Sequence, residues 1–361
     1  MDRALTFIVP GSIEQITGGY LYDRRVVEGL RADGRPVGLV ELRGRFPDAD
    51  TVARASAAAV LAALPDGALV CIDGLALAAF EEALPAAARR LAIVVLVHHA
   101  LALETGLAPE DADRYAALER ALLPLCRGVL CPSPRSAADV AAYGVPQDRI
   151  IVVPPGTDRP APAPVLVTGR AGPVRLLTVA TVTPRKGHRL LVDALAALDR
   201  RDWQLTAIGS LERDPETVAA LHAAIADHGL AAQVELAGEW PPEILPEAYR
   251  AADVFVLPSF YEGYGMAYAE AMAHGLPVIG TDAGAIPETV PDTAGILVPA
   301  GDRAALTAAL DRMIGDADLR RLYAAGAVAA AAGFLDWAGT ARLWGRSFDR
   351  LVELDGEGLD G

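Results

Sequence analysis

Two glutamates spaced eight positions apart have the residue type and the setting of a ligand site. Glu262 follows a strand-like run that ends at Ser259, and Glu270 lies in the helical segment that comes next. Gly263 and Gly265 lie between them and carry no Cβ, so the chain can turn sharply and direct backbone N–H groups at a ligand. A helix N-terminus with such N–H groups binds phosphate without a cationic side chain. This segment therefore predicts an anion site.

The predicted anion site uses backbone N–H groups around Tyr264, Gly265 and Met266. Carboxylates on both sides of a phosphate would repel it unless they bind something else. Glu262 and Glu270 have a favourable role if they accept hydrogen bonds from hydroxyl groups that flank a diphosphate. One hydroxyl would belong to a sugar ring and the other to a ribose. The spacing therefore points to a diphosphate that joins a sugar to a nucleoside.

The composition restricts the class of protein. A chain of 361 residues favours two domains, and 52% apolar with 22% charged residues excludes a disordered chain. Asp and Glu outnumber Lys and Arg by 47 to 32, and the resulting net charge of -15 argues against binding nucleic acid. Arginines between positions 24 and 45 alternate with acids, which favours an ordinary solvated face and leaves peripheral membrane contact open.

The elements that must position these residues follow an α/β pattern. Short β-branched runs alternate with Ala- and Leu-rich segments of helical spacing, which is typical of βαβ units and parallel sheets. Six strands are expected between Leu5 and Val153, and six more between Leu176 and Val298. The stretch Pro154–Pro173 is rich in proline and has no apolar periodicity, so we interpret it as a linker.

This pattern predicts two facing doubly wound, Rossmann-like domains. The first is expected at residues 1–160 and the second at 161–335, with an amphipathic helix near 336–354 that packs back onto the first domain. In such folds the ligands bind beyond the carboxyl ends of the strands. We therefore expect the site in an interdomain cleft.

We expect neither a transmembrane segment nor a secretory leader. The longest strongly apolar run, Leu91–Val97, is far shorter than the roughly 20 residues of a spanning helix. The first residues lead directly into a strand-like segment without a cleavable apolar region. Cys71, Cys126 and Cys131 cannot all pair with one another, and none has metal-ligand spacing with a histidine. We expect a cytoplasmic protein.

The segment that carries Glu262 and Glu270 resembles the E-x7-E signature of retaining GT-B glycosyltransferases, specifically of glycosyltransferase family 4. The resemblance extends along most of the chain, and the Gly18-Gly19 pair before a helix resembles the family's N-terminal glycine loop. Further stretches similar to successive family segments are 151–158, 179–195, 236–259 and 279–302.

The resemblance implies the GT-B fold and an enzyme of the hexosyltransferase class. It would move a sugar from a UDP- or GDP-type donor to an acceptor hydroxyl with retained anomeric configuration. Family members favour front-side displacement, in which the leaving phosphate takes the acceptor proton. No metal and no other cofactor is implied. The donor base, the sugar, the linkage and the oligomeric state are left open, as is the acceptor, which is a small molecule, a glycan or a lipid-linked glycan.

The resemblance also implies roles for donor-side residues. Glu270 would hold the ribose hydroxyls, and Glu262 would lie beside the hydroxyls of the donor sugar. Lys186, in the sequence PRKG after a strand, would neutralise the leaving diphosphate. The turn that supplies backbone N–H groups consists of Gly263, Tyr264, Gly265 and Met266.

One position departs from the family pattern. The family commonly has an arginine five positions before the lysine, and here that position is Thr181. Arg185, next to Lys186, either replaces the missing cation in donor binding or is a solvated loop residue. If nothing replaces it, donor affinity or turnover should be reduced.

On the N-terminal side, His98 and His99 end a buried strand where the family presents a histidine near the donor sugar. We favour His98 as the catalytic histidine, with a packing role as the alternative. Gly18 and Gly19 would allow the backbone close to the diphosphate or the acceptor, or form a plain turn. Glu288 is either a further carboxylate of the site or an ordinary acid in the first turn of a helix.

Other signals are rejected. Three D-x-D triplets each precede or open a helical segment, where acids complement the helix dipole, so we do not expect metal sites at Asp48/Asp50, Asp111/Asp113 or Asp316/Asp318. A phosphate-binding loop of the G-x-x-x-x-G-K-[ST] type is absent.

Two alternatives to a transferase remain, namely a weakly active sugar-nucleotide-binding subunit, motivated by Thr181, and a sugar-nucleotide epimerase.

Overall fold

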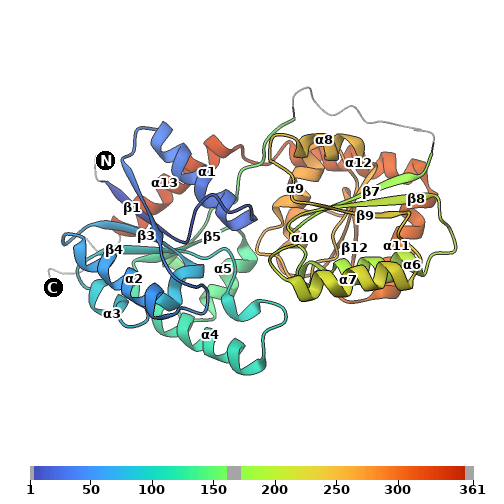
Figure 1. Cartoon of the computed structure of the whole chain (residues 1–361). Coiled ribbons are helices and arrows are strands. Elements are labelled where there is room, and N and C mark those ends of the chain that lie inside the picture. The colour runs from blue at the N-terminus through green and yellow to red at the C-terminus, as the bar shows by residue number, and fades with distance from the viewer. Residues whose placement is uncertain (1–3, 161–171, 354–361) are drawn as a thin grey trace. The chain divides into compact units, whose positions relative to one another are not determined.

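The structure, a computed structural model, describes residues 4–160 and 172–353 of the chain (Figure 1). It consists of two compact units. Unit 1 comprises the chain up to Gly156 together with the segment from Leu335 onward, and unit 2 comprises Thr157–Phe334. The predicted boundaries after residues 160 and 335 lie close to these. Most of the predicted linker, 161–171, lies outside the described residues, and the interdomain cleft stays a prediction.

Unit 1 is built on a parallel sheet of six strands in the order β2-β1-β3-β4-β5-β6. The strands are β1 (Leu5–Pro10), β2 (Val37–Leu42), β3 (Leu69–Asp73), β4 (Ala92–Leu96), β5 (Gly128–Cys131) and β6 (Ile150–Val152). The helices are α1 (Gly18–Ala32), α2 (Thr51–Ala63), α3 (Leu84–Ala87), α4 (Pro109–Leu122), α5 (Pro134–Ala141) and α13 (Trp337–Glu353), with 3-10 turns η1 (Gly74–Phe80), η2 (Leu101–Leu103), η3 (Leu123–Leu125) and η4 (Gln147–Arg149). Every residue of β3 and β4 is buried, as expected for strands with both faces covered.

Unit 2 repeats the arrangement with the strand order β12-β11-β10-β7-β8-β9. The strands are β7 (Val174–Val179), β8 (Trp203–Ile208), β9 (Val234–Gly238), β10 (Val254–Val256), β11 (Val278–Thr281) and β12 (Gly295–Val298). The helices are η5 (Pro184–Lys186, 3-10), α6 (His188–Ala196), α7 (Pro215–Asp227), α8 (Leu245–Ala251), α9 (Met266–Ala273), α10 (Ile286–Thr289), α11 (Arg303–Gly315) and α12 (Ala317–Ala331). The prediction of two doubly wound parallel sheets with six strands each is confirmed.

Each sheet has one point at which the direction of winding reverses. The chain proceeds outward from β1 to β2 and then returns to add β3 on the other side of β1, and in unit 2 it adds β10 beside β7 after completing β9. The loops that follow the two central strands therefore leave in opposite directions. Ligands of open α/β sheets bind at such points, beyond the carboxyl ends of the strands.

The last described helix, α13, belongs to unit 1 although it follows all of unit 2 in the chain (Figure 1). Its buried Trp344 packs against Phe7 of β1, with 5.8 Å between the ring centroids. The hydroxyl of Thr340 donates a hydrogen bond to the carbonyl oxygen of Pro154 at 3.0 Å. These contacts explain the aromatic pattern of the segment, since its large side chains face the sheet.

Among the described residues, no helix combines the length and the apolar content that crossing a membrane requires.

Helix α1 approaches α13 closely at Gly29. A Cβ at this position would lie 2.4 Å from the Cβ of Ala341. Gly29→Ala should therefore destabilise unit 1 by about 1–3 kcal/mol of overpacking, which outweighs the roughly 1 kcal/mol that alanine gains in a helix. Thermal unfolding measures the effect. Adding Ala341→Gly should restore much of the loss, and a single variant as stable as the parent would contradict this helix packing.

Candidate functional site

The predicted donor residues gather at the reversal point of unit 2. Lys186 lies in η5, which follows β7, and Glu262 lies in the loop that follows β10. These two strands are hydrogen-bonded neighbours, with Leu176 beside Val254. The sheet topology therefore brings together two residues that are 76 positions apart in the sequence.

The side chain of Glu262 is the centre of this group. It is 7% exposed and accepts a hydrogen bond at Oε1 from Nζ of Lys186 at 2.6 Å. The same oxygen accepts the hydroxyl of Ser259 at 2.6 Å, and Oε2 accepts Nη1 of Arg185 at 3.3 Å. Both carboxylate oxygens are thus occupied by polar donors.

The electrostatic balance at Glu262 favours the ionised form. Burial by itself raises the pKa of a carboxyl group, but the cations of Lys186 and Arg185 outweigh it and lower the pKa of Glu262 to about 2. The hydrogen bonds from Lys186 and Ser259 act in the same direction. The group is therefore a buried ion cluster with two cations and one anion at neutral pH.

Arg185 lies in this cluster rather than in solvent. Its Nη1 also donates to the carbonyl oxygen of Tyr261 at 2.9 Å, and its own carbonyl oxygen accepts the backbone N–H of Phe260 at 2.7 Å. Thr181, the position where the family commonly has arginine, is half-buried just beyond the end of β7. Two cationic side chains are therefore present at the site even though Thr181 is not one of them.

Lys186 also differs from every other basic residue of the sequence in its chemical type. It is the only lysine in the sequence, because the other 31 of the 32 basic residues are arginines. An ammonium is a compact point charge, whereas guanidinium is a planar fork, so the two are not interchangeable against a phosphate or a carboxylate.

Two glycines allow the cluster to form. Gly187 has φ of 70° and ends η5, and a Cβ there would lie 2.2 Å from the carbonyl oxygen of Pro258. The turn that carries Lys186 can therefore lie directly against the loop after β10. Gly265 has φ of 94° and precedes α9, so the loop with Glu262 turns into a helix at this residue.

The predicted anion site lies at the start of α9. Met266 is the first residue of this helix, and the first N–H groups of a helix have no partner within it. Tyr264 is fixed through its carbonyl oxygen, which accepts the hydroxyl of Thr289 at 2.6 Å. Gly263 and Tyr264 are both half-buried. Met266 thus lies at the start of a helix, and phosphate binding by this turn stays a prediction.

Glu270 lies on α9, facing Tyr249 of α8. Its Oε2 accepts the hydroxyl of the buried Tyr249 at 2.8 Å, and the ring of Tyr249 stacks on His274 with 4.8 Å between centroids. Glu270 is half-buried, so one carboxylate oxygen is fixed by a buried phenol. Glu288, on α10, is exposed.

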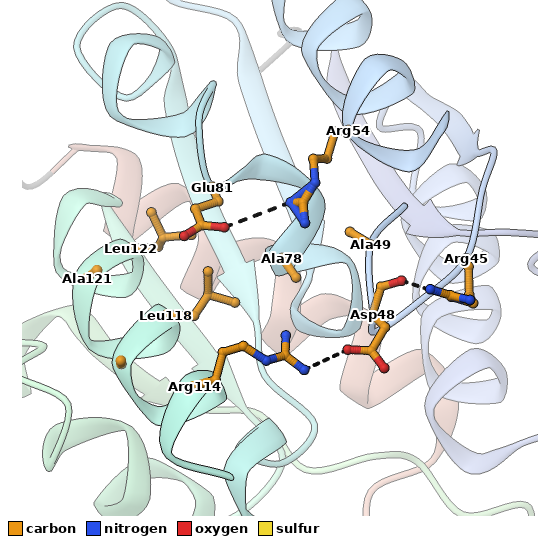
Figure 2. Close-up of a pocket in the computed structure, with 11 residues that line it drawn as sticks. Arg45, Asp48, Ala49, Arg54, Ala78, Glu81, Arg114, Leu118, Ala121 and Leu122 are labelled. Carbon is orange, nitrogen blue, oxygen red and sulfur yellow. Dashed lines mark hydrogen bonds and ion pairs between the residues drawn. The ribbon is translucent and has the colours of Figure 1, made fainter. Parts of the chain in front are cut away.

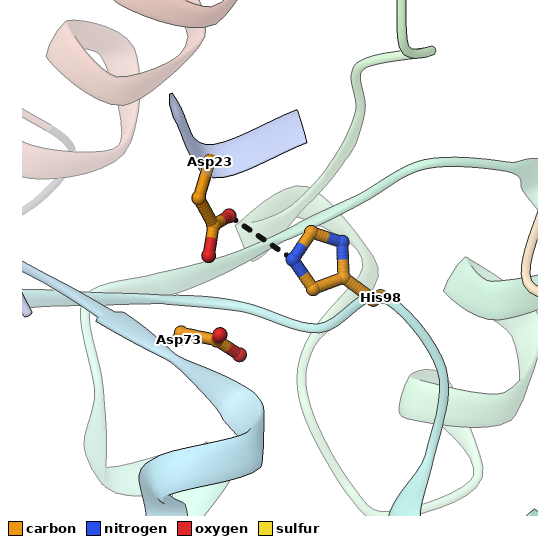
Figure 3. A group of neighbouring side chains, drawn as sticks. All are labelled: Asp23, Asp73 and His98. Atoms are coloured by element: carbon orange, nitrogen blue, oxygen red, sulfur yellow. Dashed lines mark hydrogen bonds and ion pairs between the residues drawn. The ribbon is translucent and has the colours of Figure 1, made fainter. Parts of the chain in front are cut away.

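In unit 1 the structure brings His98 together with two acids that the sequence analysis missed (Figure 3). Asp23 of α1 accepts a hydrogen bond from Nε2 of His98 or donates one to it at 3.0 Å, and Asp73 ends β3. Gly19 lies close by, since a Cβ there would be 3.2 Å from Cδ2 of His98. His99 is not in this group and pairs with Glu104 at 3.2 Å.

The signals for these acids are weak in the sequence. Asp73 is an acid at the end of an apolar strand, and Asp23 is a single acid on the buried face of α1, between Tyr22 and Val26. Gly18 begins α1, whereas Gly19 faces His98. Only the fold shows that these positions meet.

One oxygen or nitrogen atom each of Asp23, Asp73 and His98 lies within 4.8 Å of the others, a spacing that suits either a cation or a proton shared between acids. Burial and mutual repulsion raise the pKa of Asp73 to about 8, and burial raises the pKa of Asp23 to about 7. Burial also lowers the pKa of His98 below its usual 6.5. These directions are the ones expected of two buried acids that share a proton.

Unit 1 also contains a cavity of about 490 Å³ between the loop after β2 and helix α4 (Figure 2). Its charged side chains pair within the wall. Arg114 contacts Asp48 at 2.7 Å, and Arg54 contacts Glu81 at 3.9 Å. None of the predicted site residues lines it.

The D-x-D triplets have the structural roles expected of helix starts. Asp50 caps α2 by accepting the N–H of Ala53 at 2.8 Å. Asp316 caps α12, and Asp111 lies in the first turn of α4.

Two family models match the chain in succession. One, described as Glycosyltransferase Family 4, covers residues 72–159, and the other, described as Glycosyl transferases group 1, covers 173–316. Together they cover more than half of the chain and include Asp73, His98, Lys186, Glu262 and Glu270. The chain belongs to glycosyltransferase family 4. The family resemblance seen in the sequence is thereby confirmed.

Individual relatives agree with this family 4 assignment. A D-inositol 3-phosphate glycosyltransferase of Nocardia farcinica is 35% identical over 66% of this chain and 56% of its own length. The amylovoran biosynthesis glycosyltransferase AmsK of Erwinia amylovora is 32% identical over 58% of this chain and 51% of its own length. The chain thus spans little more than half the length of these curated relatives.

Solved structures confirm the predicted GT-B fold of this family 4 chain. A sucrose-phosphate synthase from Thermosynechococcus elongatus superimposes with a TM-score of 0.81 at 22% identity, covering 98% of this chain and 100% of the other. Anabaena Alr3699/HepE, solved in complex with UDP-glucose, gives a TM-score of 0.73 at 19% identity and covers 96% of this chain and 99% of the other.

The ion cluster generates a prediction about acid stability. Because the pKa of Glu262 is lowered to about 2 from 4.5, its ionised form stabilises the fold above pH 4.5, and this contribution is lost as the pH falls towards 2. Lys186→Ala should raise that pKa, which reduces stability at pH 7 by roughly 1.4 kcal/mol for each unit of change.

The difference in Tm between Lys186→Ala and the parent should therefore shrink as the pH falls from 7 to 3. Arg189→Ala is the control, because Arg189 is exposed and pairs with Asp193 on the surface of α6. A difference for Lys186→Ala that is independent of pH would contradict the proposed balance.

Proposed function

We propose that this chain is a glycosyltransferase that moves a sugar from a nucleotide-diphosphate donor to an acceptor hydroxyl. The ion cluster of Glu262, in the loop before α9, with Lys186 and Arg185 of η5 carries the proposal. It places a carboxylate that accepts sugar hydroxyls next to two cations that attract a diphosphate. The names of the relatives and the UDP-glucose bound to Alr3699/HepE support it.

The donor binds in unit 2 in this proposal. Main-chain N–H groups at Gly263–Met266 hold the diphosphate together with Lys186, and Glu270 accepts the ribose hydroxyls. Lys186 then exchanges part of its contact with Glu262 for the donor, which frees Glu262 to accept hydroxyls of the sugar. The donor base is of the UDP or GDP type.

Transfer needs no metal ion in this proposal. The negative charge that develops on the leaving diphosphate is met by Lys186 and Arg185, which replace the divalent cation of other transferases. Arg185 supplies the second cation that Thr181 does not. This removes the argument that a missing cation makes the chain only a weakly active sugar-nucleotide-binding subunit.

The configuration of the sugar is retained in this proposal. The one carboxylate next to the predicted sugar position, Glu262, is held by Lys186, Arg185 and Ser259, which makes it a poor nucleophile. Front-side displacement, in which the leaving phosphate takes the acceptor proton, uses the same cations and requires no base from the protein.

The acceptor, a small molecule, a glycan or a lipid-linked glycan, binds in unit 1 near His98. We also propose a cytoplasmic location, which agrees with three free, buried thiols at Cys71, Cys126 and Cys131.

The single lysine makes donor binding directly measurable. Reductive methylation with 13C-formaldehyde labels only Lys186 and the α-amino group and keeps the charge of both. The Lys186 signal should shift when UDP or GDP binds and stay unchanged with the corresponding nucleoside. Lys186→Arg identifies the signal by removing it. A nucleotide that raises Tm without moving the Lys186 signal would place the diphosphate elsewhere.

Turnover tests the activity itself. With the donor that gives the highest Tm, Glu262→Gln and Lys186→Ala should each lower the rate of nucleotide release in the presence of acceptor at least about tenfold, or about 1.4 kcal/mol of transition-state stabilisation. Arg189→Ala should leave the rate unchanged. The anomeric coupling of the product in 1H NMR reports retention, and EDTA should have no effect. Release without transfer to any acceptor, or epimerisation of the sugar, would refute the proposal.

A further inference from the structure

Two buried acids and a histidine meet at the reversal point of unit 1 (Figure 3). Asp23 is 0% exposed and Asp73 is 2% exposed, whereas the side chain of His98 is 19% exposed. Both acids are more deeply buried than the histidine, so His98 is the member of the group that a ligand can reach. Neither acid was needed to explain the donor site.

The hydrogen bonds of the two acids are incomplete when both are ionised. Asp73 accepts the backbone N–H of Leu75 at 2.9 Å, and Asp23 contacts His98 through Oδ1 at 3.0 Å. The second oxygen of Asp23 is buried and has no donor among the described groups. A lone pair buried without a donor is costly, and so is a second negative charge a few ångströms away.

One proton held between the acids removes both costs. One oxygen of Asp73 lies within 4.8 Å of one oxygen of Asp23, so a protonated Asp73 can donate to Asp23, and the pair then has one negative charge instead of two. The pKa of Asp73 is raised by burial and by Asp23, which agrees with this arrangement. Asp23 remains an acceptor for His98.

An accepting Asp23 fixes the tautomer of His98. If Oδ1 of Asp23 accepts, Nε2 of His98 must carry the proton, and Nδ1 then has a free lone pair. The Tyr22 ring and the imidazole pack in a T-shaped pair with 5.3 Å between centroids, and a Cβ at Gly19 would lie 3.2 Å from Cδ2 of His98. The orientation of the ring is therefore set by Asp23, Tyr22 and the start of α1.

We propose that Asp23 and Asp73 are positioning residues that share one proton and hold His98 as its Nε2–H tautomer, so that Nδ1 accepts a hydrogen bond from a substrate hydroxyl. Asp23 acts by contact with His98, and Asp73 acts through Asp23. The substrate part of this inference rests on the proposed glycosyltransferase function, whereas the tautomer and the shared proton do not.

Other titratable groups face the acids from the neighbouring elements. They are Tyr22 on α1 and Cys71 on β3, and Cys131 on β5 interacts in turn with Tyr22. Burial raises the pKa of all three, so they remain neutral between pH 5 and 9. Arg25, further along α1, lies over the ring of Trp337 at 5.6 Å. The charge of the group in this range is therefore set by Asp23, Asp73 and His98.

The shared proton predicts a pH dependence of stability that needs no substrate. A carboxyl whose pKa is raised in the folded state binds protons more tightly there than in the unfolded chain, so stability falls as the pH rises between about 4 and 8. Between pH 5 and 9, the Tm of the parent should fall more steeply than the Tm of Asp73→Asn. The asparagine amide can still donate a hydrogen bond to Asp23, but it cannot ionise. A parallel pH dependence in the two proteins would overturn the shared proton.

The tautomer is tested by 15N NMR of the protein labelled at histidine, without ligand. The signal assigned to His98 through His98→Gln should show a proton on Nε2 and none on Nδ1 at pH 7. Asp73→Asn should keep this tautomer, and Asp23→Asn should mix the tautomers. A proton on Nδ1, or a signal that Asp23→Asn does not change, would overturn the proposal. Asp193→Asn is the matched control, because it removes the exposed 2.8 Å pair with His228 and should change that histidine alone.

Activity separates positioning from mere stability. Asp23→Asn should lower kcat/KM for the acceptor about tenfold and add little in a His98→Gln background, whereas the surface variant Asp193→Asn should leave kcat/KM unchanged. If the losses of kcat/KM in Asp23→Asn and His98→Gln were additive, the proposal would be overturned. It would also be overturned if calorimetry showed stoichiometric Zn²⁺ binding that Asp73→Asn abolishes. If no donor or acceptor is turned over, the proposed function fails, while the NMR and Tm results still decide the tautomer and the shared proton.

Discussion

The carboxylate of Glu262 is buried, and its stability as an anion depends on the two cations that contact it. An isolated carboxylate with 7% exposure would take up a proton rather than remain charged. Lys186 at 2.6 Å and Arg185 at 3.3 Å reverse that preference. The arrangement requires η5 to lie directly against the loop after β10, which depends on the adjacent positions of β7 and β10 in the sheet. The topology of unit 2 and the charge of its site are thus linked.

Each unit has a buried carboxyl group at or beyond the end of the strand that lies beside its first strand, β3 in unit 1 and β10 in unit 2. The pKa values of these two groups are shifted in opposite directions. In unit 2 cations keep Glu262 ionised, so its pKa is lowered to about 2. In unit 1 no comparable cation contacts the described pair of acids, and the pKa of Asp73 is raised to about 8. One unit therefore presents a fixed charge, while the other presents a group whose charge changes near neutral pH. The same strand order thus supports both, because the charge depends on the side chains around each carboxyl group and not on the sheet.

The sequence was sufficient for the parts of this description that depend on local pattern. Alternating apolar runs predict both sheets, and the family resemblance of the E-x7-E segment and of PRKG implies the donor side of the site. Asp23 could not be found this way, because a single acid on the apolar face of a helix has no periodic signature. The pairing of Arg185 with Glu262 was equally hidden, since it depends on the order β10-β7 in the sheet and not on any spacing in the chain.

The place of α13 in unit 1 has a consequence for synthesis on the ribosome. Unit 2 is continuous in the chain, whereas unit 1 is completed only by a helix that follows Phe334. Phe7 and the face of α1 around Gly29 must wait for Trp344 and Ala341 while all of unit 2 emerges. Unit 1 therefore cannot bury this apolar face with α13 until all of unit 2 has been synthesised.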